Sequence, residues 1–238
     1  MTLEQLLPAQ LFALFLVFVR LGAAFAVLPG FAEAFVAMRF RLMLAGATSI
    51  IVAPVVGPAL PELPASPLPL LVLLASESGV GLFIGITGRL TLASIQTAGM
   101  IIGLQTSLAN AFAYDPSTAQ QGAVTSAWLG SIALVLIFAT DLHHVMLRAL
   151  VDSYALFQPG AALQLGDFAD AVTRVVSASF QLGIRIAAPF LAFGFIFFLA
   201  LGLLARLMPQ VQIFFIAMPL QIMIGFIVLA VALAIGMS

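Results

Sequence analysis

The sequence contains no cysteine and no lysine, and charged residues of any kind are scarce. Without cysteine the chain cannot form disulfides, iron–sulfur clusters or thiolate zinc sites. Only 7% of its 238 residues are charged, whereas a soluble domain usually carries about 25%. The eight basic residues are all arginines and form no cluster, so binding to nucleic-acid phosphates is not expected. These absences exclude an ordinary soluble enzyme or a nucleic-acid-binding domain.

What the sequence does contain is long apolar runs, with 63% of the residues hydrophobic. The runs are apolar on every face instead of alternating, which excludes the strands of a membrane barrel. A backbone in lipid must satisfy its own hydrogen bonds, so helices are favoured. We expect the first run to be a retained helix and no cleaved signal, because the acidic Glu4 precedes it. The sequence predicts an all-α membrane protein with six or seven hydrophobic helical segments, drawn from runs at about 11–29, 42–60, 70–114, 123–140, 167–204 and 211–237.

Prolines and glycines subdivide these runs. Residues 61–69 hold four prolines and are predicted to be non-helical, because each proline ring removes a donor and clashes with the preceding turn. The run from Leu70 contains either two helices that meet near Gly88 or one long bent helix. Gly81, Gly85 and Gly88 share one helix face and permit close approach of a neighbouring backbone, within the monomer or between subunits.

Three charged residues interrupt apolar sequence: Arg20, Glu77 and Arg89. An ionisable side chain at membrane depth costs roughly 2.5–3.5 kcal/mol on insertion scales, so each must face protein or water. Glu77 could be a proton or ion site. It could instead have a structural role, as a first-turn acid favoured by the helix dipole or as the partner of an arginine, and we favour a structural role. The two arginines either pair with carboxylates or reach the lipid headgroups, and pairing is favoured.

Asp141, His143 and His144 resemble a metal site, but we predict no metal there. Adjacent histidines on a helix project about 100° apart, and the remaining pair falls short of the three or four ligands that zinc requires. The motifs of hydrolases and of phosphate-binding loops are also absent from the sequence. We therefore expect no enzymatic activity and no cofactor.

The segment Gly103–Pro116 joins two apolar runs through small, weakly polar and aromatic residues. It is too polar to face lipid and too apolar for an ordinary loop. Such backbone is tolerated where it is buried in protein or lines a cavity, and hydrophobic constrictions are one way to close a pore. The alternative is a plain amphipathic connection between helices.

Several short motifs follow one another in a characteristic order along the whole chain: Arg20-Leu21-Gly22, Leu28-Pro29-Gly30-Phe31, Arg39, the glycine-spaced Glu77–Gly85, Gly103-Leu104-Gln105, Asp115-Pro116, Ser153, Pro159-Gly160, Pro189, Arg206–Gln212 and Pro219-Leu220. In their order and spacing the chain resembles the family of the flagellar biosynthetic protein FliR. Members of that family are inner-membrane subunits of the flagellar type III export gate.

The resemblance implies a single export-gate membrane domain over residues 1–238, built from bent helical hairpins. It implies a hetero-oligomer with two smaller export-gate membrane proteins, and contact with a further export-switch membrane protein. The substrates would be exported unfolded proteins, the surroundings membrane lipid, and nucleic acid would play no part. The expected location is the bacterial inner membrane at the flagellar basal body.

The resemblance also assigns roles to individual residues. A channel plug loop would comprise Gln105, Thr106, Ser107, Leu108, Ala109, Asn110, Phe112, Tyr114, Asp115 and Pro116, with Leu108 and Phe112 occluding the channel. Helix packing or assembly would involve Arg20, Arg39, Glu77, Gly81, Gly85, Gly88, Arg206 and Pro209. Two alternatives remain: the equivalent subunit of a virulence injectisome, and a small-solute secondary transporter, although the internal repeats that a transporter predicts are not evident.

Overall fold

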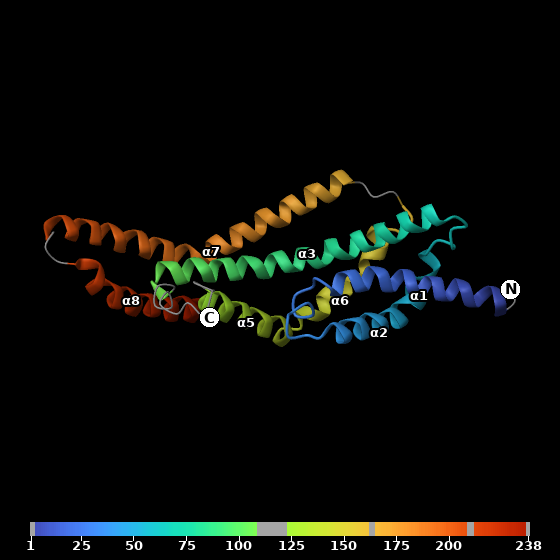
Figure 1. Cartoon of the computed structure of the whole chain (residues 1–238), viewed down its shortest axis with the longest axis horizontal. Coiled ribbons are helices and arrows are strands. Elements are labelled where there is room, and N and C mark those ends of the chain that lie inside the picture. The colour runs from blue at the N-terminus through green and yellow to red at the C-terminus, as the bar shows by residue number, and fades with distance from the viewer. Residues whose placement is uncertain (1–2, 109–122, 162–164, 209–211, 237–238) are drawn as a thin grey trace. The chain divides into compact units, whose positions relative to one another are not determined.

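The computed structural model describes residues 3–108, 123–161, 165–208 and 212–236, and no strand occurs in these ranges (Figure 1). Within them, one short 3-10 helix, η1 (Gly57–Ala59), follows the second α-helix. The predicted all-α class with six or seven helical segments is confirmed, because the same ranges hold seven α-helices: α1 (Leu3–Phe25), α2 (Met38–Val56), α3 (Pro67–Gln105), α5 (Ala123–Ala139), α6 (Leu142–Leu156), α7 (Leu165–Leu207) and α8 (Ile213–Gly236).

Most of these helices are suited to a bilayer. Four contain segments long and apolar enough to cross a membrane, at Met38–Val56, Pro67–Gln105, Gly166–Leu207 and Phe215–Ala232. The pair α5 and α6 provides a fifth candidate that is bent by 71° at the break between the two helices. Asp141 lies in this break with a left-handed backbone, at a φ of 57°. A broken helix of this kind matches the expectation of bent helical segments.

Helix α3 differs from the prediction at its start. It begins at Pro67, so the expectation that residues 61–69 are non-helical is wrong for the last three of them. Pro67 and Pro69 fall in the first turn, where backbone N–H groups have no acceptor within the helix, and the missing proline donors are therefore tolerated there. The helix then runs unbroken through Gly88, so a single long helix is observed in place of two shorter ones.

The chain forms two compact units, and the first contains Met1–Leu90 and Leu134–Val175. Within this unit α1 packs along α2, as Figure 1 shows, and α6 completes the core. The buried side chains that join these three helices are Val17, Leu21, Ala24, Phe25, Ala45, Val52, Ala53, Val56, Leu150 and Tyr154.

The second unit contains Thr91–Ala133 and Val176–Ser238. Its buried cluster brings together Ile102 of α3, Leu129 of α5 and Phe190 of α7. Half-buried apolar side chains of α8 pack against this cluster. Small cores of this kind are sufficient to hold the helices together when the outer helix faces are apolar and lie against lipid or other subunits.

The glycine face of α3 lies against α1 and the chain that follows it. A Cβ added at Gly81 would overlap the carbonyl oxygen of Arg20, and one at Gly85 would lie 2.9 Å from the carbonyl oxygen of Ala24. A Cβ at Gly88 would lie 3.0 Å from a ring carbon of Pro29. Of the two uses that the sequence left open for this face, packing within the monomer is therefore the one observed.

We predict that Gly81→Ala destabilises the first unit by about 1–3 kcal/mol, because an added methyl must push α1 away from α3. The matched control is Gly79→Ala on the same helix, where an added Cβ meets nothing within 4 Å. That change should be neutral or stabilise by roughly 0.5–1 kcal/mol through helix propensity. The free energy of unfolding of the full chain in mixed micelles measures both, and equal effects of the two substitutions would contradict the close contact.

Candidate functional site

Arg20 of α1 and Glu77 of α3 form an ion pair in the interior of the first unit. Nε of Arg20 donates to Oε2 of Glu77 at 2.7 Å, and Nη2 donates to Oε1 at 2.9 Å. Each side chain is only 1% exposed. Two parallel N–H···O bonds form the strongest arrangement between an arginine and a carboxylate. The two charges are therefore neutralised by each other inside the protein and are hidden from lipid.

The position of Glu77 within α3 decides between its predicted roles. It lies ten residues after the helix begins at Pro67, about three turns from the start. A first-turn acid stabilised by the helix dipole is therefore excluded, and pairing with an arginine is observed. The geometry also argues against an ion site, because the charge of this carboxylate is already balanced by Arg20.

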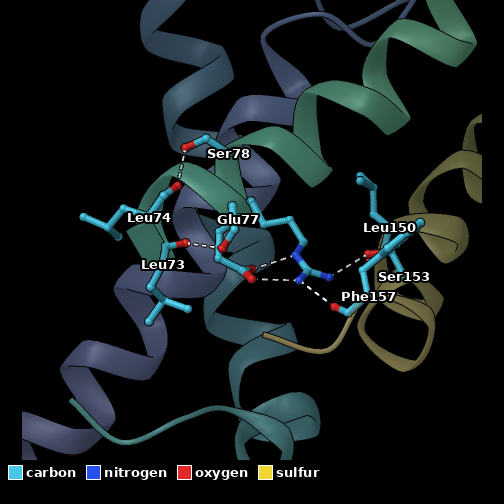
Figure 2. Close-up of polar contacts among 9 residues, drawn as sticks. Leu73, Leu74, Glu77, Ser78, Leu150, Ser153 and Phe157 are labelled. Carbon is cyan, nitrogen blue, oxygen red and sulfur yellow. Dashed lines mark hydrogen bonds and ion pairs between the residues drawn. The ribbon is translucent and has the colours of Figure 1, made fainter. Parts of the chain in front are cut away.

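The remaining donors of Arg20 reach α6 and its C-terminal end. Nη1 donates to Oγ of Ser153 at 3.1 Å, and Nη2 donates to the carbonyl oxygen of Phe157 at 2.9 Å. The guanidinium carbon lies 3.9 Å from the centre of the Tyr154 ring, within the range of a cation–π contact. Figure 2 shows Glu77 from α3 on one side of this site and, on the other, Ser153 from α6 and Phe157 directly after that helix.

This buried cluster joins three separate parts of the chain. Residues 20, 77 and 153 come from α1, α3 and α6, which are far apart in sequence. Removing one member of a buried ion pair leaves the other charge without compensation, which typically costs about 3–5 kcal/mol. The arrangement is chemically suited to holding helices together, and we call it the arginine cluster (Arg20, Glu77, Ser153, Tyr154 and Phe157).

A second ion pair holds the connector between α1 and α2. Nη1 of Arg89, on α3, donates to Oε1 of Glu33 at 2.6 Å, with the two side chains 39% and 13% exposed. Nη2 of Arg41 donates to the carbonyl oxygen of the same Glu33 at 2.5 Å. The predicted pairing of Arg89 with a carboxylate is thus observed. Arg39 and Arg206, which the sequence assigns to packing or assembly, have exposed side chains.

The predicted plug segment is described only at its beginning. Gln105 is the last residue of α3, and Nε2 of Gln221, on α8, donates to its carbonyl oxygen at 2.7 Å. Thr106 and Ser107 are buried, and Ser107 has a left-handed backbone at a φ of 56°. Leu108 is half-buried. Outside the described residues lie Ala109, Asn110, Phe112, Tyr114, Asp115, Pro116 and, further along the chain, Pro209.

Two residues of these sites were missed by reasoning from the sequence. Tyr154 carries no signal beyond being one of two tyrosines, because its role depends on α6 folding back onto α1. Gln221 did carry a signal, since it is the one polar side chain in the apolar sequence of α8. A buried polar residue in a membrane helix needs a partner, and its partner is the carbonyl oxygen of Gln105, the first residue of the predicted plug segment.

Asp141, His143 and His144 lie closer together than predicted. Each offers one ligand atom, and these atoms lie within 4.8 Å of one another. The expectation that the adjacent histidines diverge is therefore wrong, because both rings lie at the bend after α5, with their centres 4.0 Å apart. The side chains of Asp141 and His144 are 76% and 69% exposed, so water competes for this donor set of three.

Comparison with known proteins gives similarity over almost the whole chain. The family described as bacterial export proteins, family 1, matches residues 11–238. The flagellar biosynthetic protein FliR of Caulobacter vibrioides is 37% identical over 225 residues, which cover 94% of this chain and 90% of that protein. FliR of Bacillus subtilis is 30% identical over 67% of this chain and 62% of its own length. The Yop proteins translocation protein T of Yersinia pestis is 27% identical over 68% of this chain and 63% of its own length.

We predict that Ser153→Ala destabilises the protein by about 1.5–3 kcal/mol, because a buried guanidinium donor loses its acceptor. Ser76→Ala is the matched control. Both hydroxyls donate to a carbonyl three residues earlier in their own helix, but only Ser153 also accepts from Arg20. The control should change the free energy of unfolding by less than about 0.5 kcal/mol. If chemical unfolding in micelles gives the two variants the same stability, the hydrogen bond from Arg20 contributes nothing.

Proposed function

Because the chain belongs to the family of bacterial export proteins, family 1, and to its flagellar FliR members, we propose that it forms part of the channel wall of the flagellar type III export gate. It is a subunit of that gate in the bacterial inner membrane at the base of the flagellum. The near full-length similarity to the flagellar biosynthetic protein FliR is the observation that carries this conclusion.

The structure supports a subunit that works in an assembly. Large apolar side chains are exposed along its helices, and α7 alone presents Phe195, Ile196, Phe198 and Leu199. Apolar faces this extensive suit lipid or the apolar helices of neighbouring subunits. The chain functions with other components of a type III export apparatus. Its partners in our proposal are two smaller export-gate membrane proteins and a further export-switch membrane protein.

Both compact units act together in this proposal, as one export-gate domain over residues 1–238. The role is structural: exported unfolded proteins pass the chain without being chemically changed. The arginine cluster supports this role, because its charged groups are used to hold helices and are enclosed by protein.

Segment Gln105–Pro116 closes the resting channel in our proposal, with Leu108 and Phe112 as the occluding side chains. The hydrogen bond from Gln221 to the carbonyl oxygen of Gln105 supports an anchored start for this segment. The burial of Thr106 and Ser107 supports it as well, because a plug must be attached firmly at its base. A closed hydrophobic constriction excludes water and ions without any charged gate.

Two other functions have weaker support. The equivalent subunit of an injectisome is favoured by the similarity to the Yop proteins translocation protein T, which is lower in identity and covers less of the chain. A small-solute transporter is favoured by the apolar helices alone. A transporter also predicts a charged site near the membrane midplane, whereas Glu77 is already paired with Arg20.

We predict that deleting residues 108–112 makes the assembled gate leak ions, because the deletion removes both proposed occluding side chains. The chain is co-expressed with its partner membrane proteins, and ion flux is measured across the membrane of intact cells. The matched control deletes residues 61–65, five residues of the connector before α3, and should leave the membrane tight.

Native mass spectrometry of the same preparations establishes that each gate has assembled. One copy of the chain in a larger hetero-oligomer is the expected result. A chain that purifies alone or only with copies of itself would overturn the gate assignment and favour the transporter. A correctly assembled gate that stays tight after the 108–112 deletion would overturn the plug assignment alone.

A further inference from the structure

The second half of α7 has the length of a bilayer between two arginines. No charged residue occurs between Arg185 and Arg206. At about 1.5 Å per residue, the run from Ile186 to Ala205 is about 30 Å long, which equals the thickness of the hydrocarbon layer. When this run crosses the bilayer, Arg185 and Arg206 lie at the headgroup levels of opposite leaflets.

An apolar cavity lies beside Arg185 and the first residues of this run. It has a volume of about 530 Å³, and α7 lines it with Arg185, Ile186, Pro189 and Phe190. The rest of the lining comes from α8, from Ile102 of α3 and from Leu129 of α5. Phe190 and Ile102 are each only 1% exposed, so this part of the wall is held by the core of the second unit. Arg185 is the charged residue of the lining.

Arg185 has no ion-pair partner within the ranges that the structure describes, and its side chain is exposed. The other arginines discussed above that interrupt apolar sequence, Arg20 and Arg89, are both paired with a glutamate. An unpaired cation at the headgroup end of a membrane-spanning run attracts anionic lipid headgroups. The cavity therefore combines an apolar chamber with a positive charge at its headgroup end.

Proline at position 189 adds a second polar group beside that charge. In an α-helix the carbonyl of residue 185 accepts from the N–H of residue 189, which proline lacks. Residues 185 and 189 both line the cavity, so the carbonyl that loses its usual donor belongs to a lining residue. A ligand group that carries both a negative charge and a hydroxyl would satisfy the two together.

We propose that this cavity binds an anionic phospholipid of the phosphatidylglycerol type. One acyl chain fills the apolar chamber, the phosphate pairs with the guanidinium of Arg185, and a headgroup hydroxyl donates to its carbonyl oxygen. Basic pockets between membrane helices bind anionic headgroups in this way. The lining is apolar apart from Arg185, and this positive charge favours an anionic lipid over an apolar helix of a partner.

The test measures lipid binding to the purified full chain by native mass spectrometry. The delipidated protein is titrated with phosphatidylglycerol and, separately, with zwitterionic phosphatidylethanolamine. We expect the wild type to prefer phosphatidylglycerol by about five-fold, the effect of one arginine on an anionic headgroup. Arg185→Gln should abolish that preference, and Arg185→Lys should keep most of it, because lysine retains the charge.

Arg174→Gln is the matched control, because Arg174 is an exposed arginine of the same helix that does not line the cavity. It should bind both lipids as the wild type does. Equal binding of the two lipids by the wild type, or the same loss in Arg174→Gln and Arg185→Gln, would overturn the proposal. So would an unchanged lipid preference in Arg185→Gln, which would show that the arginine does not select the headgroup. The measurement involves no export, so its failure leaves the gate function untouched.

Discussion

The buried ion pair between Arg20 and Glu77 is the interaction on which the first unit depends. A charge inside an apolar protein is tolerated only with a partner and with its remaining hydrogen bonds made. Glu77 supplies the countercharge, and Ser153 and the carbonyl of Phe157 accept from two of the three remaining N–H groups. To bring these groups together, α3 must approach α1 closely, and Gly81 makes that approach possible by leaving room for the carbonyl of Arg20. Charge pairing and small-residue packing are thus two parts of one helix contact.

Most buried charges are thus paired, and the rest of the molecule is apolar on its outer faces as well as in its core. The cores of the two units are small, and many large side chains on the outer helix faces remain exposed. This combination is the reverse of a soluble domain and suits a protein whose surroundings are lipid and other subunits. Two polar residues in these apolar surroundings have roles in our proposals. Gln221 binds the start of the proposed plug, and Arg185 lines the cavity in the second unit.

Much of the secondary structure was predictable, because a backbone in lipid must satisfy its own hydrogen bonds and therefore forms helices. The contacts between distant segments were not predictable. Long runs without charge can only be helices, and the bounds of α2, α5, α7 and α8 were predicted to within about four residues. Helix α1 begins at Leu3, well before its predicted run, and α6 was not among the predicted runs. The start of α3 was misplaced because proline's cost disappears in a first turn, as at Pro67 and Pro69. A partner for Glu77 was expected, but its identity as Arg20, 57 residues away, depends on how α1 and α3 pack. The convergence of His143 and His144 depends on the break at Asp141, which the apolar pattern does not reveal.

The most direct test of this account is a double-mutant cycle at positions 20 and 77, with the free energy of unfolding of the full chain measured in mixed micelles. If the pair organises the first unit, Arg20→Met and Glu77→Leu should each destabilise by about 3–5 kcal/mol, because each leaves a buried charge alone. The double variant, with both charges gone, should be more stable than either single variant. Additive losses, with the double variant the least stable of all, would contradict the account and show that the two side chains act independently.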